Sequence, residues 1–230
     1  MKKLAFSVFA AALTFGANAA DDVKTTAAAT DSCCGYDGFY MGLGVAAIDD
    51  GFRTEENFPG KFKKESDHKT KLAGTVAMGF EKRIKEKAFL GLEAGLDASQ
   101  NSEFDDGDAR VNGLTPSVAL KLGFVHPETR TMGYLKAGAA YSRAKWNTHA
   151  EDAAGNKTPY EVRNFKWSPI VALGGEKLCG KLRTRLEAEY RFRTNKTLEN
   201  INGKGGIGNF KFTNRGAITL RAMAIYTIKK

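Results

Sequence analysis

The chain has 230 residues, with 35 Lys and Arg against 26 Asp and Glu, and 42% of its residues are hydrophobic. About two hundred residues can form one domain. Beyond the first twenty residues no apolar stretch is long enough to cross a bilayer as a helix, which excludes a helical membrane protein.

Residues 1–19 have the three regions of a secretory signal peptide. Lys2 and Lys3 form a positive start, 4–16 is apolar but too short to span a bilayer, and 17–19 reads Ala-Asn-Ala, a small-x-small cleavage site. The alternative is a buried N-terminal helix, which the order of the three regions disfavours. Removal of this segment leaves 33 bases against 26 acids. An exported protein with this charge is expected to meet lipopolysaccharide, anionic surfaces or other proteins rather than nucleic acid.

Residues 20–37 are rich in Ala, Thr and Asp, and we expect a flexible periplasmic lead-in there. From residue 38 onward, apolar residues alternate with small or polar ones in eight segments, which predicts eight strands. The segments are 38–48, 71–81, 89–99, 113–124, 134–142, 166–176, 182–193 and 217–228. Their lengths suit transmembrane strands, which need about 9–11 residues when tilted.

The segment 182–193 reads LRTRLEAEYRFR and has a helical alternative, a basic helix that grips nucleic acid. In a helix its uncharged residues would be split between two opposite sides, with charges in both gaps. In a strand the charged and uncharged residues separate completely. Helical pairs such as Arg183–Glu187 are worth only about 0.2–0.5 kcal/mol each, so the pattern favours a strand.

The connections between the predicted strands alternate in length. The short ones are 82–87, 126–130 and 178–181, and the long polar ones are 49–70, 100–112, 143–165 and 194–215. This alternation is typical of a transmembrane barrel with short periplasmic turns and long outer loops. It predicts an all-β fold, an eight-stranded antiparallel up-and-down transmembrane β-barrel over 38–230.

Outward aromatic residues are expected in two girdles at the membrane interfaces. The predicted topology puts Phe39, Phe80, Phe124 and Tyr226 on the periplasmic side and Tyr141, Trp167, Tyr190 and Phe192 on the outer side. A soluble, lipocalin-like barrel with its apolar face inward is the alternative. Both the girdles and the number of charges on the other face favour an apolar outside.

The inward face carries acids and bases in nearly equal number. The expected lumen ion-pair network contains Glu93, Asp97, Lys121, Lys136, Glu176, Arg185, Glu187, Glu189, Arg191 and Arg221, with Glu81 and Arg183 on the same face. An eight-stranded barrel is just wide enough for its own side chains to fill. We therefore expect an ion-paired plug, with a narrow ion path through it as the alternative.

Several strand sequences resemble those of a known family. FYMGLGVA, LEAGLD, YLKAGAAYS, WSPIVALGGE and LEAEYRF are similar to strands of the small eight-stranded outer-membrane barrels, the porin-family group that includes the OmpA membrane domain, OmpX-like and opacity-type adhesin barrels. The resemblance runs from Gly38 to the C-terminus. It implies a monomer in the cell outer membrane with a structural or surface-interaction role. The family usually ends on an outward aromatic residue, whereas this chain ends Tyr-Thr-Ile-Lys-Lys.

An outer-membrane lipid hydrolase or acyltransferase, with Ser and His near the outer rim, is a rival function. His126 falls in a periplasmic turn, while His68 and His149 fall in or beside the long outer loops. No serine is expected to share a strand face with any of them at a spacing that suggests a dyad. We therefore expect no enzyme, no metal site and no cofactor.

All three cysteines fall on the periplasmic side of the predicted topology, which is an oxidising space. A disulfide from Cys33 or Cys34 to Cys179 is one pairing that this topology allows, and it leaves one thiol over.

The long outer loops are expected to carry whatever specificity the protein has. In the first loop, Arg53, Lys61, Lys63 and Lys64 are candidate contacts for a host surface, a polyanion or lipopolysaccharide. The alternative is a set of solvated loops without a dedicated ligand, because exposed charge is common. The sequence thus predicts an adhesin-like surface protein, with a narrow porin-like channel as the second possibility.

Overall fold

The computed structural model describes residues 36–104, 109–151, 155–179, 182–203 and 206–228. Its strands are β1 (Gly38–Phe58), β2 (Lys61–Arg83), β3 (Ala88–Ser99), β4 (Ser102–Phe104), β5 (Ala109–Val111), β6 (Leu114–His126), β7 (Thr131–Glu151), β8 (Lys157–Cys179), β9 (Leu182–Arg191), β10 (Thr194–Gly203) and β11 (Gly206–Ile228). Among these residues, no helix is long and apolar enough to span a membrane. The predicted signal peptide at 1–19 lies outside them.

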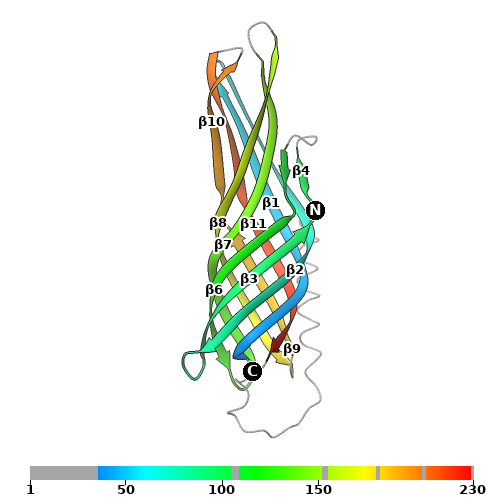
Figure 1. Cartoon of the computed structure of the whole chain (residues 1–230), viewed down its shortest axis with the longest axis vertical. Helices are drawn as coiled ribbons and strands as arrows, with labels where there is room; N and C mark the ends of the chain where they lie inside the picture. Colours follow the sequence, from blue (N-terminus) through cyan, green and yellow to red (C-terminus); the bar gives the residue numbers. More distant parts are fainter. Residues whose placement is uncertain (1–35, 105–108, 152–154, 180–181, 204–205, 229–230) are drawn as a thin grey trace.

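Eight of the strands close into one antiparallel ring (Figure 1). The ring runs β1-β2-β3-β6-β7-β8-β9-β11, and β11 pairs back onto β1. Closure leaves no open sheet edge where all eight strands pair. The predicted eight-stranded antiparallel barrel is confirmed.

The long connections predicted as loops are strand extensions instead. β1 and β2 stay paired up to Phe58 and Lys61, across the whole of 49–70. β7 and β8 stay paired to their ends, and β10 pairs with the outer half of β11. Within 100–112 a short hairpin, β4–β5, lies against β7. The extensions project far beyond the eight-stranded part at one end of the molecule (Figure 1).

The loop prediction was wrong because the polar residues of these segments hid an apolar inner side. Phe52, Trp146, Phe210 and Phe212 are all buried inside the extensions. Each large aromatic side chain removes about 150–250 Å² from water when buried, which offsets the entropy lost when the chain is ordered. Residues 52–70, 143–166 and 194–215 are called the outer module below.

The wall of the eight-stranded part is apolar on the outside. Leu43, Leu72 and Leu173 are 67%, 77% and 63% exposed. In β9 the alternation separates buried Arg183 and Arg185 from exposed Leu182, as the period-two pattern predicts. An apolar exterior around a polar interior is the arrangement of a transmembrane barrel and the reverse of a soluble one.

β1 begins at Gly38, as expected, but a residue just before it already packs against the barrel. Tyr36, which was assigned to the flexible lead-in at 20–37, is fully buried at the periplasmic mouth, and its hydroxyl donates to the carbonyl of Arg130 at 2.8 Å. It packs in an apolar cluster with Phe89 and Met132. Residues 20–35 lie outside the described part of the chain.

Candidate functional site

The barrel interior carries a network of charged side chains in which acids and bases balance. Seven carboxylates and six bases are buried, and Lys71 joins them at the edge of the network as a seventh base. The carboxylates are Asp50, Glu81, Glu93, Asp97, Glu176, Glu187 and Glu189, and the buried bases are Lys121, Lys136, Arg183, Arg185, Arg191 and Arg221. The structure therefore places all ten residues of the expected network inside the barrel. The balance lets each buried charge face an opposite one, which offsets the cost of taking it out of water.

Glu176 lies at the centre of the periplasmic half of this lumen network. Its carboxylate accepts from Arg183 Nη1 and from Arg185 Nε, each at 2.8 Å, and Lys121 Nζ contacts the same group. Glu81 accepts from Lys121 and from Arg183, each at 2.6 Å. These contacts join β2, β6, β8 and β9 across the lumen, so they fix the barrel's cross-section.

Three tyrosines alternate with the cations of this half. Arg183 lies 5.2 Å from the ring centre of Tyr36 and 4.9 Å from that of Tyr40. Arg185 lies between Tyr40 and Tyr134, at 5.5 and 5.4 Å. Cation–π contacts of this kind are worth about 2 kcal/mol or more when desolvated. The tyrosines thus fill the space between charges that would otherwise hold water.

Glycines make room for two of these rings. Tyr40 is the cross-strand partner of Gly79, and Tyr134 is the partner of Gly174. A Cβ atom at either glycine would lie within 2.5 Å of the facing tyrosine ring. The sequence of one strand cannot reveal this fit, because the ring and the glycine that makes room for it lie in two different strands.

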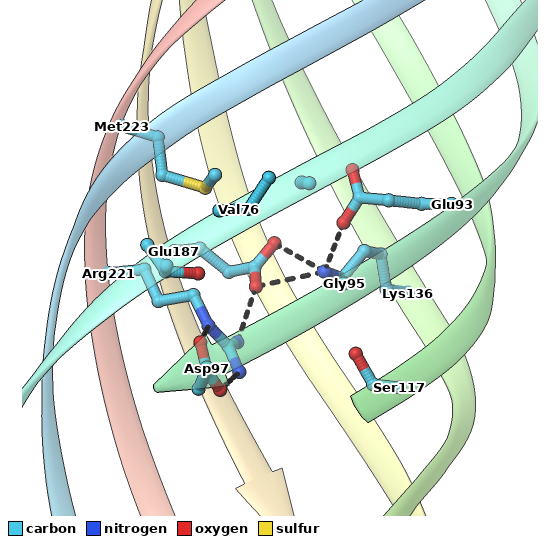
Figure 2. Close-up of a pocket in the computed structure, with 11 residues that line it drawn as sticks. Val76, Glu93, Gly95, Asp97, Ser117, Lys136, Glu187, Arg221 and Met223 are labelled. Atoms are coloured by element: carbon cyan, nitrogen blue, oxygen red, sulfur yellow. Dashed lines mark hydrogen bonds and ion pairs between the residues drawn. The ribbon is translucent and has the colours of Figure 1, made fainter. Parts of the chain in front are cut away.

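The outer half of the lumen network is centred on Arg221 (Figure 2). Its guanidinium donates to both oxygens of Asp97, at 3.1 and 2.6 Å, and also to Glu187 at 2.8 Å. Lys136 donates to Glu93 at 2.7 Å and to Glu187 at 2.9 Å. The cavity among these side chains measures about 10 Å³, close to the least that one water molecule needs. The side chains themselves therefore fill this level of the barrel.

A third, smaller group lies further toward the outer module. Asp50 accepts from Arg191 at 2.5 Å and pairs with Lys71 at 2.7 Å. The prediction missed Asp50 because it was placed in a loop. The sequence pattern could have indicated an inward position, because Asp50 continues the alternation of the inward residues Ala46 and Ile48.

The eight girdle residues all lie on the outer wall. Phe39 packs on Phe80 with ring centres 4.9 Å apart, and Phe124 and Tyr226 are 61% and 48% exposed. At the other interface the rings pair in the same way. Tyr141 lies 5.4 Å from Trp167, and Tyr190 lies 5.0 Å from Phe192. Aromatic rings at two levels of an apolar wall mark the borders of a bilayer.

Comparison with solved structures agrees with this arrangement. The outer membrane protein OprG from Pseudomonas aeruginosa matches with a TM-score of 0.52 and 10% sequence identity, over 85% of this chain and 98% of that one. The fold is that of the small eight-stranded outer-membrane β-barrels. Neisserial surface protein A gives 0.46 with 12% identity, over 84% and 98% of the two chains, and Ail of Yersinia pestis gives 0.36 with 13% identity, over 80% and 99%. No protein-family model and no curated protein matches the chain.

The outer module is a second core stacked on this barrel fold. Trp146 packs edge-on against Phe210 at 5.5 Å and stacks with Phe212 at 6.4 Å, and Phe52 stacks with Phe212 at 6.3 Å. Ile201 and Val162 belong to the same buried cluster. This cluster gives the outer module an apolar interior.

The expected loop contacts lie on this module. Arg53 forms an ion pair with Glu55, and Lys63 pairs with Glu65 at 2.8 Å. Lys64 is exposed, while the side chain of Lys61 falls outside the described part of the structure. Carboxylates thus neutralise two of the four candidate cations, which weakens the case for this hairpin as a polyanion site.

The opposite hairpin of the outer module carries an exposed ion cluster. Glu161 accepts from Arg163 at 2.8 Å and pairs with Lys145 at 3.1 Å. Hydrogen bonds first from Arg163 and then from Lys145 hold the pKa of the Glu161 carboxyl at about 2, below its ordinary value of 4.5. All three side chains are exposed, so the cluster contributes little to stability.

The three histidines are scattered. His126 lies at the end of β6, where its Nδ1 is 3.3 Å from the Thr129 hydroxyl. His149 lies in β7, far along the chain from His68 in β2. Because β2 extends outward, Ser66 and His68 lie two residues apart on one face of it, which the predicted loop did not allow. No hydrogen bond joins these two side chains, and in the described chain no group of three His, Cys, Asp or Glu side chains could hold a metal.

Cys179 is exposed at the periplasmic end of β8. Its expected partners, Cys33 and Cys34, lie outside the described residues. The disulfide therefore stays a prediction.

Proposed function

We propose that this protein is an integral outer-membrane barrel that acts at the cell surface through its outer module, as an adhesin-like interaction protein, and that it is neither a channel nor an enzyme. The signal peptide exports it, and the two aromatic girdles seat it in the membrane. The partner is a host surface or a polyanion, and the barrel is a monomer without a cofactor.

The observation that carries this proposal is the packing of the outer module. Phe52, Trp146, Phe210 and Phe212 bury their rings inside strand extensions that stand beyond the membrane. A membrane anchor alone needs only short connections between its strands. Ordered extensions present a rigid surface, and a rigid surface binds with a smaller entropy loss than solvated loops do.

The filling of the lumen supports the second half of the proposal. An apolar cluster around Tyr36 and Phe89 lies at the periplasmic end, and the aromatic cluster of the outer module lies at the other. Between them run the ion pairs of the lumen network, in which Lys121, Arg185 and Arg221 each face two or more carboxylates. An ion would have to cross two apolar layers and break buried pairs to pass.

The test combines location with binding. Cell fractionation should find the protein in the outer membrane, and protease added to intact cells should cut the outer module. Cells that carry the wild-type protein should adhere to immobilised heparin or to epithelial cells. Removal of one of the three long hairpins, with a two-residue turn in its place, should reduce that adhesion. A soluble protein, or unchanged adhesion after removal of each of the three long hairpins in turn, would contradict the proposal.

A further inference from the structure

The outer half of β2 has an open edge. β1 pairs with β2 as far as Lys61, whereas β3 joins the other side of β2 only from Ala73 onward. Between Lys61 and Thr70 no strand in the described part of the chain pairs with that other side. From Phe62 to Thr70 every side chain except that of Glu65 is exposed. This stretch is therefore held by β1 alone, and a row of its backbone groups is left without a neighbouring strand.

Every second residue of this stretch points its amide and carbonyl away from β1. Phe58 and Lys61 flank a two-residue turn, and in such a turn the fourth residue donates to the carbonyl of the first. Hydrogen-bonded and non-hydrogen-bonded pairs then alternate along the ladder, so the odd-numbered residues of this stretch bond to β1. The residues that face the open edge are Phe62, Lys64 and Ser66. The next in this series, His68, has the same orientation, because its amide donates at 2.7 Å to Asp67 Oδ1 and not to β1.

Two other open edges of the outer module are interrupted. Among the described strands β10 pairs with β11 alone, and its register shifts between Leu198 and Ile201. The outer half of β8 carries Pro159, which has no amide to donate. The outer half of β2 contains no proline, and its register with β1 runs without a shift. Bulges and prolines hinder the addition of a strand, whereas a regular edge permits it.

The side chains along the open edge are an aromatic ring followed by a cation. Phe62 is 66% exposed, and Lys64 lies next to it on the same face, because alternate residues of a strand point the same way. The Lys64 ammonium forms no ion pair with any residue that the structure describes. Glu55, its cross-strand partner on β1, pairs with Arg53 and Lys211 instead. The edge thus offers an apolar contact and a positive charge to a partner.

We propose that the edge of β2 from Phe62 to Ser66 binds an extended segment of a partner protein, which adds to the sheet as a further strand. In this mode of recognition main-chain hydrogen bonds give affinity, and the side chains opposite give specificity. Residues two apart on the added strand lie opposite Phe62 and Lys64, so the fitting segment has an apolar and an acidic residue separated by one position. This binding mode rests on the proposed function, which places the outer module outside the membrane, and it makes the partner a protein.

The test uses the full chain refolded in detergent and a fluorescent ten-residue peptide in which Thr alternates with Val and Glu in turn. Fluorescence anisotropy measures the binding. S66P removes an amide from the open edge and leaves the bonds to β1 in place, so it should weaken binding at least roughly tenfold. K64E should weaken binding at least roughly threefold and should favour a peptide with Lys in place of Glu. The matched control is K196E, which reverses another exposed lysine of the outer module, on β10, and should leave binding unchanged.

Hydrogen exchange locates the contact. The peptide should slow the exchange of the Phe62, Lys64 and Ser66 amides, and it should leave the Lys63 amide unchanged because that amide already bonds to β1. Equal binding by S66P and the wild type, or an equal loss in K196E and K64E, would overturn the site. So would a dimer that protects the same amides without peptide, since the edge would then belong to a second copy of the chain.

Every variant must first show the migration shift between heated and unheated gel samples that marks a folded barrel. The binding assay needs no cells, so its failure is distinguishable from failure of the proposed function. Loss of peptide binding with adhesion intact overturns the strand addition alone. Unchanged adhesion after removal of each long hairpin overturns the proposed function, whatever the peptide does.

Discussion

Tyr134 lies directly opposite Gly174 on the neighbouring strand, and its hydroxyl occupies the space that a side chain at Gly174 would need. A Cβ atom there would lie 2.2 Å from the hydroxyl oxygen and 2.3 Å from Cζ. The same hydroxyl donates to Glu187 at 2.6 Å. One glycine therefore fixes both the position of a ring and a hydrogen bond of the lumen network.

Replacing this glycine should destabilise the barrel. G174A would push the whole Tyr134 ring away and break its bond to Glu187, at a cost of about 1–3 kcal/mol. Urea unfolding in micelles, followed by tryptophan fluorescence, measures the change. G133A is the matched control, since a Cβ at Gly133 meets nothing within 4 Å. Equal stability of G174A and G133A would refute the role given to this pair.

Removal of Arg221 should be much more costly than removal of a surface lysine. R221M leaves Asp97, Glu187 and Glu189 facing one another without their shared partner, and the loss of one side of a buried pair costs about 3–5 kcal/mol. K64M, on the exposed side of β2, should change the free energy of unfolding by less than about 0.5 kcal/mol. The same unfolding assay compares them, and a cost below about 1 kcal/mol for R221M would show that these charges are solvated.

The outer module should become less stable when a large side chain of its core is truncated. F210A removes a buried ring that contacts Phe58, Trp146 and Tyr160, and truncations of this kind cost about 3–5 kcal/mol. Hydrogen exchange and protease cleavage of 194–215 should accelerate, while the membrane part stays folded. F62A is the control, because Phe62 is 66% exposed in the same module. Unchanged protection in F210A would mean that the extensions do not form a packed core.

Glu161 should remain ionised to unusually low pH. Its folded pKa of about 2 lies below the ordinary 4.5, so its interaction with Arg163 and Lys145 is fully present above pH 4.5 and is lost as the pH falls through about 2. A nuclear magnetic resonance titration of the Glu161 carboxyl should give this low value, and R163Q should raise it. Titration of the wild type near 4.5 would contradict the hydrogen bonds seen at this position.

The alternation of residue types along each strand predicted which side chains face the lumen and which face outward. In β9 it separated Arg185 and Glu187 from Ala188, because side chains of a strand point to opposite faces in turn. It could not show which charges meet, since Asp50 and Arg191 lie 141 residues apart and only the register brings them together. The role of the glycines opposite Tyr40 and Tyr134 could not be predicted for the same reason.

The outer module was missed on different grounds. Alternation continues through Phe52, Thr54 and Glu56 in β1, but the polar residues around them resemble a loop. Their neighbours in the fold, Phe210 and Phe212, come more than 150 residues later in the chain. A segment whose apolar side is supplied by distant strands carries too little local signal of its own.

The claim that the lumen is closed can be tested most directly by single-channel recording. The refolded protein would be inserted into a planar bilayer in 1 M salt, with heat-modifiable migration in gels as proof of folding. We expect no stable conductance above the bare membrane, because apolar clusters close both ends and ion pairs fill the middle. Reproducible stepwise openings from the folded wild-type protein would contradict it.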